Sequence, residues 1–311
     1  MNSKLNKVSN PASILTKEQF RALNKVSDHK ALVHLFIRVL LNVFLIYLML
    51  FMSAKSFEFG LTVAYFIYAT QIHFWGYAGI GHELLHRRVF SSKFLNDILY
   101  QFCSSLTWNN AAMFRDTHML HHRQPLSEDD IEAQSVRNWS LLYVLQYAFI
   151  DVRALFRRLF YVTINALGVY PNFTPLSPDY VRSARITLAI NLVLYLALYF
   201  LAQDLLVTSL MAVAPFSCSL LNKILAKAQH HDLLVLKDEG ALKFSRTLVL
   251  PKILSFLYAN MNYHAEHHFA PSVPYYNLPK MHSLLEAKGH VSSQSFFSFF
   301  NKEFRSVWLK H

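Results

Sequence analysis

Long apolar stretches dominate the chain, and their lengths predict helices that cross a membrane. A transmembrane helix needs about 20 predominantly apolar residues. Four stretches approach or exceed this length: Ala31–Met52, Phe57–Ile80, Ile186–Ala202 and Leu205–Leu221. Only a few residues separate the two members of each pair, so the four stretches form two hairpins. We therefore predict an all-α integral membrane protein with four transmembrane helices arranged as two hairpins and with a cytoplasmic helical cap.

The polar segments between and beyond the hairpins belong to the same single domain, which covers residues 1–311. A cytoplasmic N-terminal segment (1–30) leads into the first hairpin (31–80), and a cytoplasmic and interfacial region (81–185) precedes the second hairpin (186–221). Residues 222–311 form the cytoplasmic cap. Within the interfacial region, residues 139–170 are aromatic and basic, and arginines are costly at bilayer depth. We therefore predict an amphipathic helix on the membrane surface there.

The chain carries a net charge of +11, and the positions of its lysines and arginines predict its orientation. Basic residues gather in the N-terminal segment, between the hairpins and in the last third, whereas the tip of the second hairpin around Gln203 and Asp204 has none. By the positive-inside rule, both termini and the middle region are cytoplasmic. The charge therefore reports topology, and no nucleic-acid-binding module is recognisable. Two cysteines exclude a disulfide framework and suit a reducing compartment.

Half of the 16 histidines lie in three short clusters. The spacing i, i+3, i+4 places three imidazoles on one face of a helix, and it occurs twice, beside a shortened pair with the spacing i, i+4. The clusters are His82 and His86; His118, His121 and His122; and His264, His267 and His268. Two predicted crossings separate the second cluster from the third, and none separates the first from the second. All three clusters therefore lie on the cytoplasmic side, where the cap holds them.

Converging imidazoles on this scale predict a metal site. Neutral imidazoles packed together would otherwise each need a hydrogen-bond partner. A catalytic zinc ion uses about three protein ligands, so these clusters overfill it. Two metal ions with four or five ligands each accommodate them, and imidazole suits iron, copper and zinc alike. We choose iron, because a site at the membrane edge beside long apolar helices suggests the activation of O2 against an unreactive hydrocarbon.

The three clusters resemble the histidine boxes of the membrane-bound fatty acid desaturase and hydroxylase superfamily. They match the boxes in order and spacing, and the segment NYHAEHHFAPSVPYYNLP from Asn262 to Pro279 closely resembles the third box of the acyl-lipid desaturase branch. The resemblance covers about residues 60–285. It implies a helical membrane fold with a cytoplasmic cap, two iron ions held by the boxes, and an O2- and electron-dependent oxidation of a lipid or fatty acyl substrate.

The resemblance also implies one more ligand and a partner protein. Family members usually add a histidine between the last span and the third box, and both His230 and His231 match that place, with a slight preference for His230. Because no fused cytochrome-type heme segment is apparent, we expect a separate electron donor of ferredoxin or cytochrome type, and an acidic donor suits the basic cytoplasmic face. The full predicted ligand set is His82, His86, His118, His121, His122, His230, His231, His264, His267 and His268.

Charged and polar residues beside the clusters have two interpretations. Glu83, Asp116 and Glu266 either hydrogen-bond ligand histidines and fix their tautomers or are plain surface carboxylates. The acidic run Glu128–Asp130 is most simply part of a solvated loop. His73, alone on an apolar aromatic face, is expected to be a packed residue rather than a ligand.

Other functions are open at this point. A hydroxylase or ketolase of the same superfamily, acting on an acyl chain or on another lipid such as a carotenoid, would use the same metal set. The sequence His82-Glu83-Leu84-Leu85-His86 also spells the zincin motif of zinc metalloproteases, although this reading leaves six clustered histidines unused. A metal carrier would need a polar path across the bilayer, which the spans do not offer. No motif encodes the acyl carrier, the chain length, the double-bond position, the donor's identity or the oligomeric state.

Overall fold

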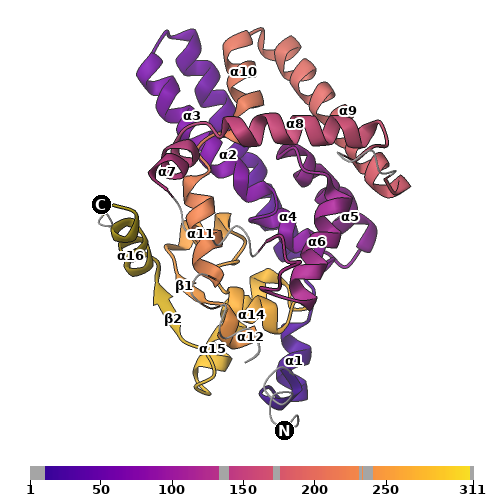
Figure 1. Cartoon of the computed structure of the whole chain (residues 1–311), viewed down its shortest axis with the longest axis vertical. Coiled ribbons are helices and arrows are strands. Elements are labelled where there is room, and N and C mark those ends of the chain that lie inside the picture. The colour runs from indigo at the N-terminus through magenta and orange to yellow at the C-terminus, as the bar shows by residue number, and fades with distance from the viewer. Residues whose placement is uncertain (1–10, 133–139, 171–175, 231–232, 234–240, 309–311) are drawn as a thin grey trace.

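The computed structural model describes residues 11–132, 140–170, 176–230, 233 and 241–308, which are mainly helical (Figure 1). The α-helices are α1 (Lys17–Leu23), α2 (Asp28–Ala54), α3 (Glu58–Ile72), α4 (Ile80–Leu85), α5 (Lys93–Leu106), α6 (Ala111–Arg123), α7 (Leu141–Ala148), α8 (Val152–Ala166), α9 (Pro178–Ala202), α10 (Leu205–Val213), α11 (Leu220–His230), α12 (Ala241–Phe244), α13 (Lys252–Leu257), α14 (His264–Phe269), α15 (Leu278–Glu286) and α16 (Phe296–Trp308). Short 3-10 helices are η2 (Pro11–Ser13), η3 (His73–Trp75), η5 (Ala214–Phe216) and η7 (Tyr275–Asn277), and the strands are β1 (Thr247–Val249) and β2 (Ser293–Ser295).

The two hairpins lie at one end of the molecule, where α2 packs against α3 and α9 against α10 (Figure 1). Two stretches of the described chain are long and apolar enough to cross a membrane: Lys17–Ala54, which contains α2, and Pro178–Ala202, which is α9. A shorter apolar helix, Leu205–Phe216, comprises α10 and η5. Two of the four expected spans are therefore long and apolar enough to be transmembrane helices.

Large apolar side chains point outward from both long helices. Phe36 and Phe44 of α2 are 62% and 57% exposed, and Val193 and Leu201 of α9 are 65% and 86% exposed. Contiguous apolar surface of this kind marks a contact with protein or membrane. These helices are therefore typical of a protein whose outer surface contacts lipid.

The second expected span, Phe57–Ile80, is not one helix. The helix α3 ends at Ile72, and η3 and a turn precede α4. Gly79 explains the turn, because a Cβ atom at this position would lie 2.0 Å from the carbonyl oxygen of Phe74. Only glycine lets the two backbone segments approach so closely. The break makes the orientation of α4, which carries His82, independent of the axis of α3.

Replacing Gly79 by alanine is expected to destabilise the fold and to displace α4. The added methyl group would overlap the Phe74 carbonyl oxygen, and backbone cannot move aside as a flexible side chain can. Overpacking of this kind typically costs about 1–3 kcal/mol. Thermal unfolding in detergent should show a lower Tm for Gly79→Ala, and the purified variant should contain less metal than the wild type.

Gly289→Ala is the control for this prediction. Gly289 has a φ of +72°, but no atom lies within 4 Å of an added Cβ. Alanine there costs about 1–2 kcal/mol for the left-handed backbone and leaves α4 in place. Metal content, rather than Tm alone, therefore separates the two variants. Equal metal content in Gly79→Ala and wild type would contradict the role assigned to this turn.

The fourth expected span, Leu205–Leu221, is also interrupted. The helix α10 ends at Val213, and η5 contains Pro215, which lacks the N–H group that would continue a helix. Ser217 is then extended and pairs with Ile150 in an isolated bridge. After this break α11 leaves the hairpin and carries its last residue to the histidine clusters.

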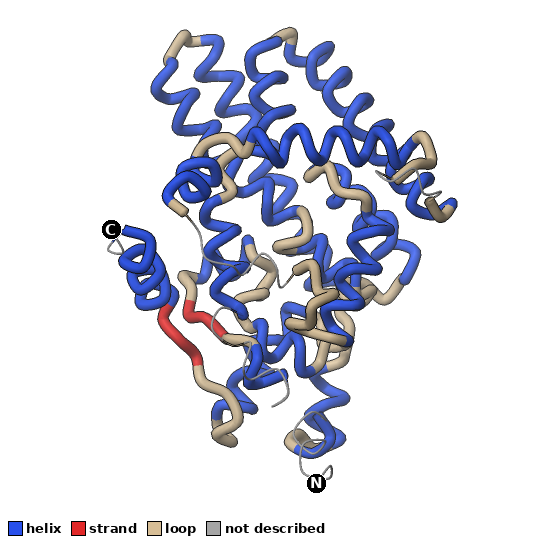
Figure 2. The backbone as a smooth tube through the Cα atoms, viewed as in Figure 1, coloured by secondary structure: helices blue, strands red, loops and turns tan. Residues whose placement is uncertain are grey.

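The described residues are mostly helical, as expected, and add one pair of short parallel strands, red in Figure 2. Strand β1 pairs with β2 in the register Thr247↔Ser293. Thr247 and Val249 are β-branched and favour an extended backbone. Pro251, just after the strand, cannot donate to a ladder and limits its length.

A continuous apolar core joins the first hairpin to the cap. Leu45 and Met49 of α2 belong to the same buried cluster as Leu84 of α4 and as Ala265 and Phe269 of α14. Close-packed interiors hold their side chains in defined rotamers. Because α4 and α14 share this cluster, their histidines are held at fixed positions relative to each other.

Arg38, inside α2, connects the first hairpin to α13 through hydrogen bonds. Its side chain is 1% exposed, donates hydrogen bonds to the carbonyl oxygens of Phe256 and Leu257, and lies 5.0 Å from the centroid of the Phe256 ring. The last carbonyls of a helix lack intrahelical donors, and a cation there complements the helix dipole. Arg38 therefore holds the C-terminal end of α13 against α2.

The amphipathic helix predicted within residues 139–170 is α8, which follows α7. Figure 1 shows α8 crossing the molecule, and it packs against α9 and η5 of the second hairpin. Phe156 and Phe160 are 68% and 57% exposed on it. Arg158 donates from Nη1 to the Thr107 carbonyl oxygen at 2.8 Å. The helix itself is confirmed, and its position on a membrane surface stays a prediction.

Candidate metal centre

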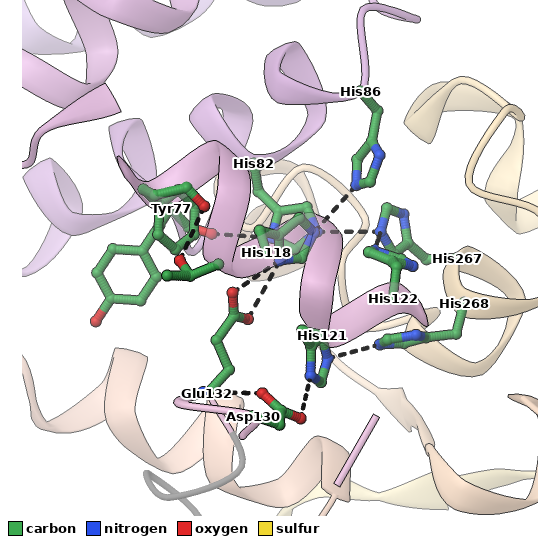
Figure 3. A network of polar contacts seen from close by, with 12 residues as sticks. Tyr77, His82, His86, His118, His121, His122, Asp130, Glu132, His267 and His268 are labelled. Carbon is green, nitrogen blue, oxygen red and sulfur yellow. Dashed lines mark hydrogen bonds and ion pairs between the residues drawn. The ribbon is translucent and has the colours of Figure 1, made fainter. Parts of the chain in front are cut away.

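Four helices bring the histidines together inside the molecule, and Figure 3 shows histidines from three of them, α4, α6 and α14. The helix α4 carries His82 and has His86 at its C-cap, α6 and α14 carry the second and third clusters, and α11 ends at His230. On α6 and α14 the i, i+3, i+4 spacing places three rings on one face. The two helices meet where the Nε2 atoms of His121 and His268 lie 3.1 Å apart.

The ring nitrogens form two groups, and within each group all the potential ligand atoms lie within 4.8 Å of one another. The five-histidine group consists of His82, His86, His118, His122 and His267. The four-histidine group consists of His121, His230, His264 and His268. Each group has the number of nitrogens that one metal ion takes. His231, also predicted as a ligand, lies outside the described residues. His73 is packed as expected, with Nε2 2.7 Å from the Ser217 carbonyl oxygen, and joins neither group.

Burial keeps most of these imidazoles neutral. It lowers the pKa of His82, His230 and His267 to about 3. Burial first, and then the neighbouring histidines, hold the pKa values of five further rings well below the ordinary value: His86, His118, His122, His264 and His268. A metal ion binds the lone pair of a neutral imidazole, so this protonation state suits coordination.

Backbone carbonyl oxygens fix the tautomer of two histidines. The Nδ1 atom of His82 lies 3.0 Å from the Tyr77 carbonyl oxygen, and that of His230 lies 3.0 Å from the Phe244 carbonyl oxygen. A carbonyl oxygen only accepts, so Nδ1 carries the proton and donates it in both residues. The lone pair is then on Nε2, which faces the other histidines.

Two carboxylates from the loop after α6 have the same effect on the second cluster, as Figure 3 shows. His118 Nδ1 donates to Glu132 Oε1 at 2.9 Å, and His121 Nδ1 donates to Asp130 Oδ2 at 2.7 Å. Burial by itself would lower the pKa of His121, but the hydrogen bond to Asp130 and the charge of Glu132 outweigh it and raise that pKa. Carboxylate partners of this kind orient metal-binding histidines and increase their basicity.

Contacts between Nε2 atoms in the four-histidine group fit a cation better than hydrogen bonds. His264 Nε2 lies 2.9 Å from His230 Nε2 and 3.0 Å from His268 Nε2. His121 and His230 hold no proton on Nε2, since Nδ1 carries it. His264 could donate from Nε2 to His230, and His268 could donate from Nε2 to His121. The Nε2–H groups of His264 and His268 would then face each other at 3.0 Å. A metal ion that accepts all four lone pairs removes this conflict, so the donor set fits a metal.

The five-histidine group has the same character. His267 Nε2 lies 3.0 Å from His82 Nε2 and 3.2 Å from His122 Nε2. The Nδ1 atom of His267 lies 3.2 Å from Glu83 Oε1. Both atoms are buried, and they do not form a hydrogen bond with each other. His267 therefore links the third cluster to the first two, with a carboxyl group behind it.

Of the three carboxylates considered as partners, only Glu83 approaches a clustered histidine. Asp116 instead accepts a hydrogen bond from the Tyr180 hydroxyl at 2.5 Å, because it faces α9. Glu266 accepts from His282 Nδ1 at 2.6 Å. Its place in α14, between the residues of the i, i+3, i+4 face, turns its side chain away from the clustered histidines.

The acidic loop after the second cluster is not simply solvated, contrary to the expectation for residues 128–130. The first two of these residues are exposed, but Asp130 is 1% exposed and accepts hydrogen bonds from His121 and from the N–H group of Leu126. Asp130 and Glu132 are the functional residues that the motifs did not reveal. The available signal was their place shortly after a histidine cluster, because buried imidazoles need acceptors for Nδ1.

The pair of Glu266 and His282, outside the two groups, makes folding stability depend on pH. The hydrogen bond to Glu266 raises the pKa of His282 above its ordinary value of 6.5. The folded protein therefore binds this proton more tightly than the unfolded chain, so the stabilisation is complete below pH 6.5 and is lost as the pH rises through the folded-state pKa. We expect the Tm difference between wild type and His282→Gln to shrink with rising pH in thermal unfolding. A difference that grows would contradict this assignment.

A cavity of about 510 Å³ reaches both groups of histidines. His82 of the five-histidine group lies in its wall, together with His121, His230 and His264 of the four-histidine group. Volumes of about 300–1,000 Å³ are usual for sites that bind small molecules. The cavity therefore gives a substrate access to both candidate metal positions.

The fold and the site together indicate a helical membrane protein with a histidine-rich metal centre. A sequence model of the fatty acid desaturase family matches residues 56–300, which include the four helices that carry the clustered histidines. The match covers most of the chain, so the protein belongs to the fatty acid desaturase family. A search of curated proteins gives no match. With this family, the two histidine groups are consistent with a di-iron enzyme of the desaturase superfamily.

Proposed function

We propose that the protein is a membrane-bound di-iron oxidoreductase that desaturates a fatty acyl chain, using O2 and electrons from a separate donor. The observation that carries this proposal is the separation of the histidines into a group of five and a group of four. Each group would hold one iron ion through its imidazole nitrogens. His231 stays a candidate ligand. Membership of the fatty acid desaturase family supports the reaction class.

When bound, the iron ions would supply the O2 chemistry that removes hydrogen from an unactivated hydrocarbon. In the overall reaction the acyl chain loses two hydrogen atoms, and O2, two electrons and two protons complete the balance to two water molecules. The protein's own groups prepare the site. Glu132 and Asp130 hold His118 and His121 in one tautomer, and burial of the rings excludes bulk water.

The cavity beside the histidines is the proposed substrate site. Phe114, Tyr258 and Met261 give it apolar and aromatic walls, and it touches members of both histidine groups. A hydrocarbon chain that enters it replaces water against these walls, which is favourable. The same contacts would hold a methylene group close to both metal positions.

We further propose that four segments cross the bilayer as two hairpins, with both termini and the site on the cytoplasmic side. The helices α2 and α9 have the length and the apolar surface of spans, and the shorter α3 and α10 would complete the hairpins. Basic residues at the predicted cytoplasmic segments support this orientation. A separate ferredoxin- or cytochrome-type donor would dock on that basic face.

The alternatives differ in how well the geometry suits them. A hydroxylase or ketolase of the same superfamily, acting on an acyl chain or another lipid, would use the same ligands, so its product must distinguish it. A zinc protease is disfavoured. Glu83 of the zincin motif is 1% exposed, faces His267 and does not line the cavity, so a peptide could not reach it. Three further imidazoles lie beside His82 and His86, whereas a catalytic zinc ion would need only one more protein ligand.

Lipid analysis of cells that express the gene tests this proposal. The wild type should produce, only in the presence of O2, an acyl chain that lacks two hydrogen atoms. A product that gains one oxygen atom would identify a hydroxylase, and His121→Ala should give neither product. Unchanged lipids in cells that contain iron-loaded protein and a competent donor would overturn the proposed reaction.

A further inference from the structure

Three basic side chains line the cavity that reaches the histidines. Lys223, in α11, and Arg157 and Arg158, in α8, form part of its wall together with Tyr77. Because α8 packs against α9 and η5 of the second hairpin, its arginines enter the cavity from the hairpin side. The cavity therefore has a basic region in addition to the region lined by histidines.

The contacts of Lys223 and Arg158 are with uncharged groups. Lys223 Nζ lies 3.3 Å from the Tyr77 hydroxyl oxygen and 5.5 Å from the centroid of the Tyr147 ring. Arg158 donates to a backbone carbonyl oxygen. Within the part of the chain that the structure describes, no carboxylate forms an ion pair with Lys223, Arg157 or Arg158. Three basic side chains therefore line the cavity without a carboxylate paired to them among the residues that the structure describes.

The two carboxylates whose charges reach this region are engaged elsewhere. Glu132 lines the cavity but accepts a hydrogen bond from His118 Nδ1. Asp151 accepts hydrogen bonds from the Gln146 side chain and from the Ala154 N–H group at the start of α8. Among the described residues, neither carboxylate forms an ion pair with Lys223, Arg157 or Arg158.

The Tyr77 hydroxyl marks the basic region of the cavity, because Lys223 Nζ donates to it at 3.3 Å. A positive region of this kind stabilises an oxyanion, because charge-assisted hydrogen bonds are short and strong. The ligand that suits the cavity therefore combines an oxyanion with an apolar chain.

We propose that Lys223, Arg157 and Arg158 bind the anionic head of the substrate, a carboxylate or a phosphate group, while its hydrocarbon chain extends along the cavity toward the histidines. This assignment rests on the proposed function and narrows the substrate to acyl compounds that carry an oxyanion. A neutral lipid such as a carotenoid lacks that group and would leave the partly buried Lys223 and Arg158 without an anion, which is unfavourable.

Binding of three probes with matched tails tests the anion site. Octyl phosphate, octanoate and octanol are titrated into iron-loaded protein in amphipol and followed by isothermal titration calorimetry. We expect at least one of the two anions to bind about tenfold or more tightly than octanol. Preference for octyl phosphate would identify a phosphate ester as the head group, and preference for octanoate would identify a free carboxylate. Equal binding of all three probes would overturn the proposal.

Variants on α8 and α11 locate the site. Combining Lys223→Gln with Arg157→Gln should reduce the advantage of the anions by about tenfold or more and leave octanol binding and iron content unchanged. Lys223→Gln alone gives the same comparison if the double variant loses iron. Arg153→Gln is the matched control, because Arg153 is on the same helix but lies over the Tyr143 ring, outside the cavity. It should bind all probes as the wild type does.

The outcomes separate this proposal from the proposed reaction. An anion preference that survives in the Lys223 and Arg157 variants would place the anion elsewhere and overturn the site. Iron-loaded protein that binds anions through these residues but oxidises no lipid would refute the reaction and leave the binding site intact.

Discussion

His267→Ala is expected to weaken iron binding in the five-histidine group and to abolish oxidation of the lipid substrate. The His267 Nε2 atom lies 3.0 Å from that of His82 and 3.2 Å from that of His122, so loss of this ring opens the five-histidine group. The four-histidine group keeps all its members. Elemental analysis of the purified variant should give less iron per chain than the wild type, which should give about two ions because each group suits one ion.

A surface histidine provides the control for this variant. His290 is exposed and belongs to neither group, so His290→Ala should keep the iron content and activity of the wild type. Thermal unfolding with and without a chelator separates loss of metal from misfolding, because a bound metal stabilises only the folded state. Full iron content and full activity in His267→Ala would remove the metal-centre interpretation.

Asp130→Asn is expected to weaken metal binding by about 10–100-fold, the range for lost carboxylate partners of metal-binding histidines. Asp130 Oδ2 accepts from His121 Nδ1 and from the Leu126 N–H group, and Oδ1 accepts from the Glu132 N–H group. Asparagine has only one oxygen, so in either orientation its NH2 group faces a donor. His121 would no longer be held with its lone pair on Nε2. Metal titration against a competing chelator measures the loss.

Asp129→Asn is the matched control, because it makes the same substitution at the exposed neighbouring residue. Its metal affinity should equal that of the wild type. If Asp130→Asn also binds metal as the wild type does, the carboxylate does not orient His121, and Asp130 serves only to shape the loop.

The histidine clusters could be located from the sequence because helical periodicity is a local property. The spacing of His264, His267 and His268 alone places them on one face of a helix, and α14 has that face. The same periodicity separates Glu266 from them, although it is adjacent in sequence. Its actual partner, His282, belongs to α15 and is brought near only by tertiary packing.

The breaks in the apolar stretches and the burial of Asp130 could not be predicted in the same way. Hydropathy averaged over a window does not detect a turn such as the one at Gly79, which depends on contact with the Phe74 backbone. Pro215 was a visible signal for the second break. Asp130 follows two acidic residues that are exposed, and its contacts with His121 and with the Leu126 N–H group, which depend on tertiary structure, distinguish it from them.

The most direct test of the metal centre is the metal content per chain of wild-type protein purified in detergent under iron-replete conditions. Two groups of histidines predict about two iron ions per chain, one for each group. A single zinc ion per chain would contradict this account, because it would leave most of the clustered imidazoles without a function and would restore the zincin motif at His82, Glu83 and His86 as the better explanation.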